Sequence, residues 1–421
     1  HGDRFFYPNP LESDGSHERK PWFDCSCCPT NVARFLPSLP GYIYAYDENG
    51  IFVNLYISNT SGFETVFGSI QIKMNTEYPW KGKVNMEVNP EMPGSFAMML
   101  RIPGWAGESP LPGDLYHFAD KAKSKPEIHI NGKKQDYELT DGYALIKREW
   151  KKGDQIRLEL PMEIRKIKAN EKIAEDRGKL AVSRGPVVYC AEWIDNNGKA
   201  RNIMVDSDVV FENRFKSEMI DGIEILEVEG YKVSLDDNDR LVKEKEKLLL
   251  IPYYSWAHRG NGEMLVWLPY VDSAANPVAP PTIASEAKVS ASFVHDELLA
   301  IHDQVIPENS NDHSIPRFTF WNHKGTEEWV QYDFKEITPV SFLHVYWFDD
   351  GPNGGCRIPK SWKVLYMDDG KWKEVRKHGK YPVSKDGFNT IEISPIETTS
   401  IRLVIELQDG FSGGILEWKV E

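Results

Sequence analysis

The feature that most constrains this fold is a long series of short segments in which apolar and polar residues alternate. Between residues 69 and 168 these segments occupy 69–74, 83–88, 95–102, 127–130, 144–147, 155–160 and 163–168. Asn131-Gly132 and Asp141-Gly142 mark turns between several of them. A side-chain period of two, broken by frequent turns, is typical of strands in β-sandwiches. The pattern therefore predicts an all-β chain of tandem β-sandwiches.

One short stretch has a helical pattern. Residues 30–39 (TNVARFLPSL) predict a helix with Thr30 or Asn31 as its cap, cut short by Pro37. Residues 42–57 follow with two apolar runs around an Asn-Gly turn, which predicts a hairpin. We therefore expect a short helical stub in front of the sandwiches.

Residues 274–286 are rich in proline and predict an extended linker, because proline favours polyproline conformation and lacks the backbone donor that a sheet needs. Beyond the linker the strand pattern resumes and predicts a jelly-roll-like sandwich. The expected segments are an N-terminal segment 1–43, a first sandwich 44–148, a second sandwich 149–273, the linker 274–286 and a distal module 287–421.

Charge and hydropathy exclude two classes of partner. The 421 residues include 50 basic and 64 acidic ones, a net charge of −14, so we expect no nucleic-acid partner. No apolar run is long enough to cross a bilayer, and none resembles the core of a signal peptide. The chain begins with His1 rather than Met, which we interpret as a processing or fragment boundary.

Three of the five cysteines, Cys25, Cys27 and Cys28, lie within four residues. Such a cluster can supply soft thiolate ligands to zinc, which keeps a thiol deprotonated at neutral pH. Two alternatives stay open: a redox pair of Cys25 and Cys28, which have Cys-x-x-Cys spacing, and inert buried cysteines. Cys190 and Cys356 stand alone and are expected to behave as small hydrophobic residues.

Several motifs around this cluster resemble one enzyme family. They are RFFYPNPLES at 4–13, PWF at 21–23, CCPTNVAR at 27–34, LPGYIY at 39–44, IPYYSWAHRG at 251–260 and GEMLVWLP at 262–269. Together they resemble glycoside hydrolase family 127, the β-L-arabinofuranosidase family, over about residues 1–270. The later two motifs resemble the closing β-domain of that family.

The resemblance implies a retaining glycosidase whose nucleophile is a zinc-bound cysteine thiolate. By position, Cys27 matches the nucleophile and Cys28 a second zinc ligand. Cys25 has no family role and is a candidate substitute or neighbour. Such a mechanism needs an acid/base carboxylate roughly 5–5.5 Å from the nucleophile.

The family's catalytic domain is a helical (α/α)6 barrel, which supplies the acid/base Glu and the Glu and Cys that complete the zinc site. Residues 1–43 resemble only the end of that barrel. We do not assign the absent roles to Glu12, Glu18 or Asp24, which we expect to be solvated. We therefore expect no turnover from this chain in isolation.

The distal module resembles the discoidin-like group (factor V/VIII type C), which includes carbohydrate-binding module family 32. The matching stretches are 328–334, 356–366 and 414–420. The resemblance implies sugar binding at loops on one end of the sandwich, where an aromatic ring stacks on the sugar.

The candidate sugar-binding residues of this module are Phe411, Trp321, Trp347 and His323, with Asp349 as a polar residue beside the aromatic rings. Residues 308–312 (ENSND) are rich in the oxygen atoms that calcium prefers as ligands, and some relatives of this fold bind calcium, so the segment is interpreted as a plain polar loop with a calcium site as the alternative.

Two classes of function follow. The first is a zinc-dependent glycosidase acting on terminal β-L-arabinofuranosides in an arabinose-containing oligo- or polysaccharide. The second is a non-catalytic carbohydrate-binding protein, and a thiol redox protein is a third reading. The resemblance allows a homodimer through a β-sandwich. We expect a periplasmic or secreted protein, although a free-thiol cluster is easier to keep reduced in the cytosol.

Overall fold

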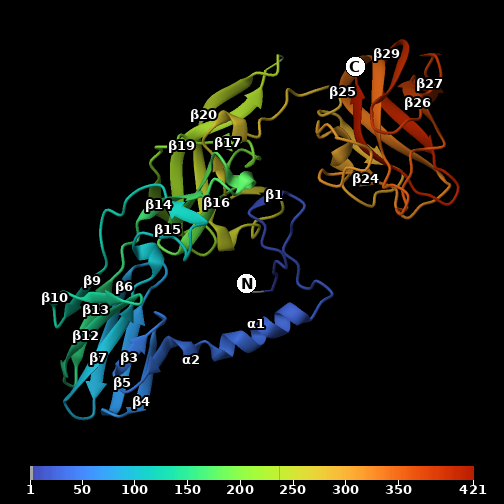
Figure 1. Ribbon diagram of the computed structural model, residues 1–421. Coiled ribbons are helices and arrows are strands. Elements are labelled where there is room, and N and C mark those ends of the chain that lie inside the picture. Colours follow the sequence, from blue (N-terminus) through green and yellow to red (C-terminus); the bar gives the residue numbers. More distant parts are fainter. Residues whose placement is uncertain (1–2, 237) are drawn as a thin grey trace. The chain divides into compact units, whose positions relative to one another are not determined.

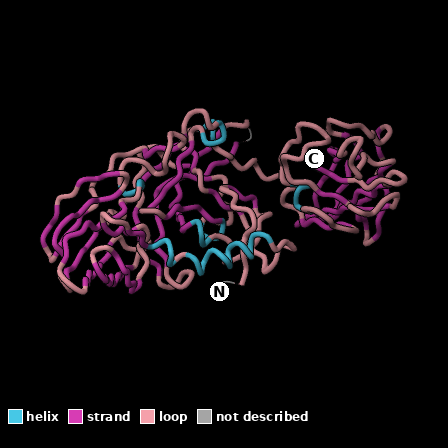
Figure 2. The backbone as a smooth tube through the Cα atoms, turned by 60° about the horizontal axis from the view of Figure 1, so that its bottom comes forward, coloured by secondary structure: helices cyan, strands magenta, loops and turns pink. Residues whose placement is uncertain are grey.

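The protein is described here by a computed structural model that covers residues 3–236 and 238–421. The chain forms two compact units, one ending at Val278 and one beginning at Ala279, and each is described by itself (Figure 1). Strands make up most of the regular structure in both units, which confirms the all-β prediction (Figure 2).

The first unit begins with two short helices, α1 (Cys27–Ser38) and α2 (Pro40–Ile43). Helix α1 starts at Cys27, with Ser26 as its N-cap, so the prediction of a start at Thr30 or Asn31 was wrong. Pro29 is compatible with this earlier start, because amides in the first turn of a helix have no partner within it. Pro37 lies inside the last turn, and the helix ends one residue later.

A β-sandwich of two sheets follows the helices. One sheet contains, in spatial order, β10 (Lys133–Gln135), β9 (Glu127–Ile130), β13 (Asp154–Glu159), β6 (Lys83–Pro90), β5 (Gly68–Thr76) and β4 (Asn59–Thr65). The other contains β11 (Glu138–Thr140), β12 (Tyr143–Trp150), β7 (Gly94–Arg101), β3 (Gly50–Val53) and β2 (Tyr44–Tyr46). Neighbouring strands are antiparallel except β3 and β7, which are parallel.

The core of this sandwich takes alternate residues from both sheets, among them Ile72 and Met98. At its centre Trp150 is fully buried and donates a hydrogen bond to the carbonyl of Phe96 at 3.1 Å. Strand β12 crosses the predicted boundary at residue 148, and β13 pairs with β6. The first sandwich therefore extends through Glu159, and the predicted boundary at 148 was too early.

The rest of the first unit forms one large twisted sheet. Its main path is β17 (Ile203–Met204), β19 (Ile223–Leu235), β20 (Leu241–Pro252), β16 (Val187–Glu192), β15 (Lys179–Arg184), β14 (Ile164–Ala169) and β8 (Tyr116–Phe118). Off this path lie β1 (Glu12–Asp14), β18 (Glu212–Lys216), β21 (Glu263–Leu265) and β22 (Leu268–Pro269). Successive residues of its strands enter two different core clusters, so both faces of the sheet are covered.

The second unit contains one set of eight strands. Their path is β24 (Phe318–Thr319), β30 (Gly414–Val420), β25 (Glu327–Phe348), β29 (Asn389–Glu406), β26 (Ser361–Asp368) and β27 (Lys371–Glu374), with β23 (Lys288–Ala291) on β25 and β28 (Lys377–His378) on β29. Register shifts between Asp333 and Thr338 and between Val340 and Phe342 let the long strand β25 bend around the core. Tyr332 stacks on Trp418 in that core, with ring centroids 4.0 Å apart.

Short 3-10 turns connect several of these strands. They are η1 (Gly104–Ala106), η2 (Ala174–Asp176), η3 (Trp193–Asp195), η4 (Tyr253–Ser255), η5 (Asp272–Ala274) and η6 (Leu298–His302).

Candidate functional site

The three clustered cysteines form one group of sulfur atoms in the first unit. The Sγ atoms of Cys25 and Cys27 are 3.1 Å apart, and those of Cys27 and Cys28 are 3.8 Å apart. The phenol oxygen of Tyr7 lies 3.4 Å from the sulfurs of both Cys27 and Cys28 and 3.7 Å from that of Cys25. Cys27 and Cys28 are exposed and none of the three forms a disulfide, so this group is accessible to reagents and substrates.

Helix α1 places two of these sulfurs at its positive end. Cys27 and Cys28 are its first two residues, where unpaired backbone N–H groups and the helix dipole stabilise negative charge. The side-chain amide of Asn31 donates to the carbonyl of Cys27 at 2.8 Å and ties down this first turn. The first turn of the helix therefore fixes the position of the Cys27 sulfur at this end.

Tyr7 is held beside the sulfurs by its neighbour Phe6. The Phe6 ring stacks on Trp256 at 4.3 Å with an interplanar angle of 8°, and the Arg19 guanidinium lies 4.7 Å from the Phe6 centroid. Arg19 also donates to the carbonyls of Trp256 at 2.9 Å and Tyr254 at 2.8 Å. The N-terminal segment is thus anchored to the turn after β20, far away in the sequence.

That turn is braced by ion pairs around the Arg259 guanidinium, which is 23% exposed. The carboxylate of Glu192, 1% exposed, accepts from the backbone N–H of Ala257 at 2.6 Å and pairs with the guanidinium of Arg259. Arg259 also pairs with Asp195. Because the Glu192 carboxylate is buried, leaving it without these partners is costly, and its contacts hold the turn that carries Trp256 in place.

The contacts with the three sulfurs also act on Tyr7 itself. Hydrogen bonds to Cys27, Cys28 and then Cys25 raise the pKa of the Tyr7 phenol well above its usual value. The phenol keeps its proton and can donate it in a hydrogen bond to a sulfur anion. Tyr7 lies within a motif quoted above, but no role was predicted for it, because the contact bridges twenty residues.

The sulfur group meets the demands of zinc only in part. Two thiolates on one tetrahedral zinc, with Zn–S bonds of about 2.3 Å, lie about 3.8 Å apart. The sulfurs of Cys27 and Cys28 have this separation, whereas Cys25 is too close to Cys27. Across residues 3–236 and 238–421, no three or more His, Cys, Asp or Glu side chains are grouped to hold a metal.

Two of the three carboxylates considered above form ion pairs. Glu12 pairs with Arg201 at 2.6 Å, and Glu18 pairs with Lys20 at 3.1 Å. Asp24 adopts a left-handed backbone conformation, with φ of 54°, just before the cysteines.

The second unit has a pocket of about 260 Å³ among the loops at one end of its strands. Trp321, 37% exposed, forms part of its wall together with Asp296, Arg317 and Asp350. Gly355 lies against the indole, since a Cβ atom there would come within 2.1 Å of Trp321 Cζ3. The pocket therefore combines a half-exposed aromatic ring with charged hydrogen-bonding groups.

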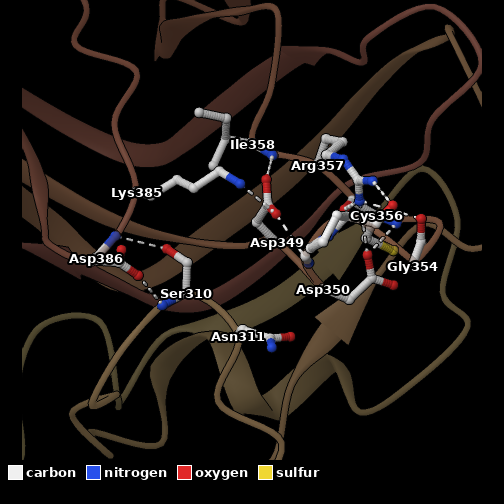
Figure 3. Close-up of polar contacts among 12 residues, drawn as sticks. Ser310, Asn311, Asp349, Asp350, Gly354, Cys356, Arg357, Ile358, Lys385 and Asp386 are labelled. Atoms are coloured by element: carbon white, nitrogen blue, oxygen red, sulfur yellow. Dashed lines mark hydrogen bonds and ion pairs between the residues drawn. The ribbon is translucent and has the colours of Figure 1, made fainter.

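A network of polar contacts fixes the loops beside this pocket (Figure 3). Ser310 and Asp386 exchange hydrogen bonds at 2.8 and 2.9 Å. Asp349 is buried, binds Lys385 at 2.7 Å and accepts from the backbone N–H of Ile358 at 3.2 Å. Although burial alone would raise it, these contacts hold the pKa of Asp349 below its usual value. The Asp349 carboxylate therefore makes internal contacts that hold the loops in position.

The Asp350 carboxylate fastens the loop on the pocket side of this network. It accepts from the backbone N–H groups of Gly355 and Cys356, both at 2.9 Å, and pairs with Arg357 at 3.1 Å.

The predicted sugar-binding residues lie in different environments in the structure. Trp347 is 1% exposed and packs edge-on against Trp362 in the core, so its prediction as a sugar-stacking residue was wrong. His323 stacks on Phe293 at 4.0 Å and binds Glu328 at 2.7 Å.

Phe411 is half-buried beneath the guanidinium of Arg357, whose Cζ lies 4.4 Å from the ring centroid. The structure thus places Trp321 in the pocket wall, with Phe411 on a neighbouring loop. Arg317, Asp296 and Asp350 line the pocket and were not predicted.

In the oxygen-rich loop 308–312, side-chain oxygens accept hydrogen bonds from backbone N–H groups of the loop and of Ser314. Asp312 accepts from the N–H of Glu308 at 3.1 Å and of Ser314 at 2.9 Å, and Asn309 accepts from that of Asn311 at 2.9 Å. A calcium site in this loop stays a prediction.

In the part of the chain that the structure describes, no helix combines the length and apolar character that crossing a membrane requires.

Comparison with family models identifies four consecutive matches. Residues 1–41 match the β-L-arabinofuranosidase GH127 catalytic domain, 50–162 the GH127 middle domain and 164–269 the glycoside hydrolase family 127 C-terminal domain. Residues 296–417 match the F5/8 type C domain.

Comparison with whole proteins points the same way. A non-reducing end β-L-arabinofuranosidase of Bifidobacterium longum is 30% identical over 295 residues, which are 63% of this chain and 42% of the relative. The solved structure of a GH127 β-arabinofuranosidase is 44% identical with a TM-score of 0.63, covering 66% of this chain and 44% of the other. A GH127 β-L-arabinofuranosidase of Geobacillus stearothermophilus T6 is 34% identical with a TM-score of 0.56, covering 64% and 43%. The chain spans less than half the length of each of these relatives.

Proposed function

Because residues 1–269 carry three successive matches to its domains, the chain belongs to glycoside hydrolase family 127, and we propose that Cys27 supplies the nucleophile of a retaining β-L-arabinofuranosidase. The observation that carries this proposal is the position of Cys27. It is exposed, stands first in helix α1 and contacts Tyr7 and two further thiols. Such surroundings activate a thiol as a nucleophile.

The proposed zinc ligands from this chain are Cys27 and Cys28, whose sulfur separation of 3.8 Å suits one tetrahedral ion. Bound zinc would keep both sulfurs deprotonated at neutral pH. Tyr7, whose raised pKa keeps its phenol protonated, donates a hydrogen bond to the sulfur cluster and orients it.

In the proposed reaction the Cys27 sulfur attacks the anomeric carbon of a terminal β-L-arabinofuranoside. The carbon–sulfur bond forms as the bond to the aglycone oxygen breaks, and a carboxylic acid protonates that oxygen. The carboxylate then removes a proton from water, which displaces the Cys27 sulfur with a second inversion.

The carboxylic acid and the remaining zinc ligands are proposed to come from other catalytic-domain residues of the family. Three observations support this assignment: only residues 1–41 match the catalytic domain, the matched region covers 42% of the Bifidobacterium relative, and the described residues hold no complete metal site. Helix α1 also exposes Val32, Phe35 and Leu36 by more than half, as expected of a helix that packs on further helices. We therefore propose that this chain alone shows no glycosidase turnover.

For the second unit we propose binding of arabinose-containing saccharide at the Trp321 pocket. A half-exposed indole suits the apolar face of a sugar ring, and the Arg317 guanidinium can donate to its hydroxyl groups. If no catalytic partner domain exists, this pocket supports the second candidate function, a non-catalytic carbohydrate-binding protein.

The test is hydrolysis of an aryl β-L-arabinofuranoside by the gene product that contains this sequence. Hydrolysis should be lost in Cys27→Ser and kept in Cys356→Ser, a matched control whose sulfur is buried in the second unit. Hydrolysis that survives in Cys27→Ser would contradict the assigned nucleophile. Absence of hydrolysis from the gene product would leave the carbohydrate-binding function, and robust turnover by residues 1–421 alone would contradict the incomplete site.

A further inference from the structure

Cys25 has no part in the proposed hydrolysis, yet its sulfur is the nearest one to Cys27. The Sγ–Sγ distance of 3.1 Å is shorter than the separation of two thiolates on one zinc ion, about 3.8 Å. A disulfide bond is about 2.05 Å long, so about 1 Å of further approach would join the two atoms. Cys25 is thus placed to react with Cys27 rather than to share a metal with it.

We propose that Cys25 and Cys27 form a reversible oxidation site in which a disulfide caps and protects the Cys27 sulfur. The proposal builds on the nucleophilic character that the proposed function assigns to Cys27. Cys25 precedes helix α1, so its backbone is free of the helical hydrogen-bond ladder, and Cys27 is exposed to small oxidants. Cys28 follows Cys27 directly, and two adjacent cysteines bridge only with strain.

The chemistry balances with a peroxide as the oxidant. The Cys27 thiolate attacks one peroxide oxygen, the O–O bond breaks, and Cys27 becomes a sulfenic acid as hydroxide leaves. The Cys25 sulfur then attacks the Cys27 sulfur, the S–S bond forms, the S–O bond breaks, and water leaves with the Cys25 proton. Two electrons pass from the two thiols to the peroxide. A dithiol reductant returns them and restores both thiols.

Such a site would matter most outside the reducing cytosol. A sulfenic acid without a neighbouring thiol is oxidised further to sulfinic acid, which dithiols do not reverse. Cys25 intercepts the sulfenic acid first and keeps the damage repairable. This role explains why a third sulfur lies against the cluster although it is too close to Cys27 to share a tetrahedral metal with it.

The test is peptide mapping of residues 1–421 after treatment with hydrogen peroxide and alkylation by iodoacetamide. Trypsin releases all three cysteines in one peptide, residues 20–34, because cleavage between Lys20 and Pro21 is blocked. We expect this peptide to have lost two hydrogens and to carry its single alkyl group on Cys28. After dithiothreitol it should carry three alkyl groups.

Two variants distinguish the proposed pair from its alternatives. Cys28→Ser should form the same disulfide, whereas Cys25→Ser should accumulate sulfinic acid at Cys27 and recover about tenfold less alkylatable Cys27 after dithiothreitol. An alkyl group on Cys25 or Cys27 in the oxidised wild-type peptide, or equal recovery in Cys25→Ser, would overturn the proposal. No glycoside is used, so this outcome is independent of the hydrolysis assay.

Discussion

Glu417 is a buried carboxyl group whose replacement should make the second unit more stable in alkaline solution. It lies in β30, is 1% exposed and accepts a hydrogen bond from the backbone N–H of Gln304 at 3.1 Å. Burial, with the neighbouring charge of Asp303, raises its pKa from 4.5 to about 8. The folded protein therefore holds this proton over a range of pH in which the unfolded chain has released it.

The sign and size of the effect follow from proton linkage. Between pH 4.5 and 8 the folded state binds more protons, so the free energy of unfolding falls as pH rises through this range. At about 1.36 kcal/mol per pH unit, the gap corresponds to at most about 5 kcal/mol, and local relaxation lowers this to about 2–4 kcal/mol. Glu417→Gln keeps the shape and an acceptor oxygen but cannot ionise.

Calorimetry of the 421-residue chain from pH 5 to pH 9, with EDTA present to exclude cations, measures the effect. The melting temperature of Glu417→Gln should rise relative to wild type as pH increases, with the largest gain above pH 8. Glu392→Gln on the exposed side of β29 is the matched control and should show no such trend. A melting temperature lowered equally at every pH would refute the reasoning.

Three further changes test the site. Glu192→Gln removes the buried carboxylate charge that pairs with Arg259, while Asp195 stays as the other partner, and should lower the free energy of unfolding of the first unit by about 2 kcal/mol, measured in urea. Trp256→Ala removes the ring on which Phe6 stacks, so iodoacetamide should alkylate Cys27 several-fold faster once the Tyr7 phenol no longer covers its sulfur; an unchanged or slower rate contradicts the anchoring. Trp321→Ala should weaken arabinan binding at least about tenfold in affinity electrophoresis, and equal retardation would exclude the pocket.

The sequence could predict the class of fold because alternation and turns are local features. The hairpin of β2 and β3 and most strands of the first sandwich follow from residues close together in the chain. The boundary near residue 148 could not be placed in this way, since β13 joins β6 across more than sixty residues. Helix α1 was predicted to start too late because Thr30 and Asn31 are favoured cap residues, whereas the helix starts at Cys27 and its first turn accepts Pro29.

The candidate site could be predicted only as far as its chemistry lies within one stretch. Cys27 and Cys28 are adjacent in sequence, but the contact with Tyr7 and its support by Trp256 are tertiary. Burial of Trp347 could not be told from exposure, since aromatic residues at strand ends occur in cores and in loops alike.

The role of Cys27 as a nucleophile is tested most directly by trapping the enzyme during turnover. The gene product that contains this sequence is mixed with an aryl β-L-arabinofuranoside, quenched in acid and digested, and the peptide of residues 20–34 is analysed by mass spectrometry. The account predicts a pentosyl group on the sulfur of Cys27. Hydrolysis that proceeds with the pentosyl group on a carboxylate, or with none on Cys27, would contradict it.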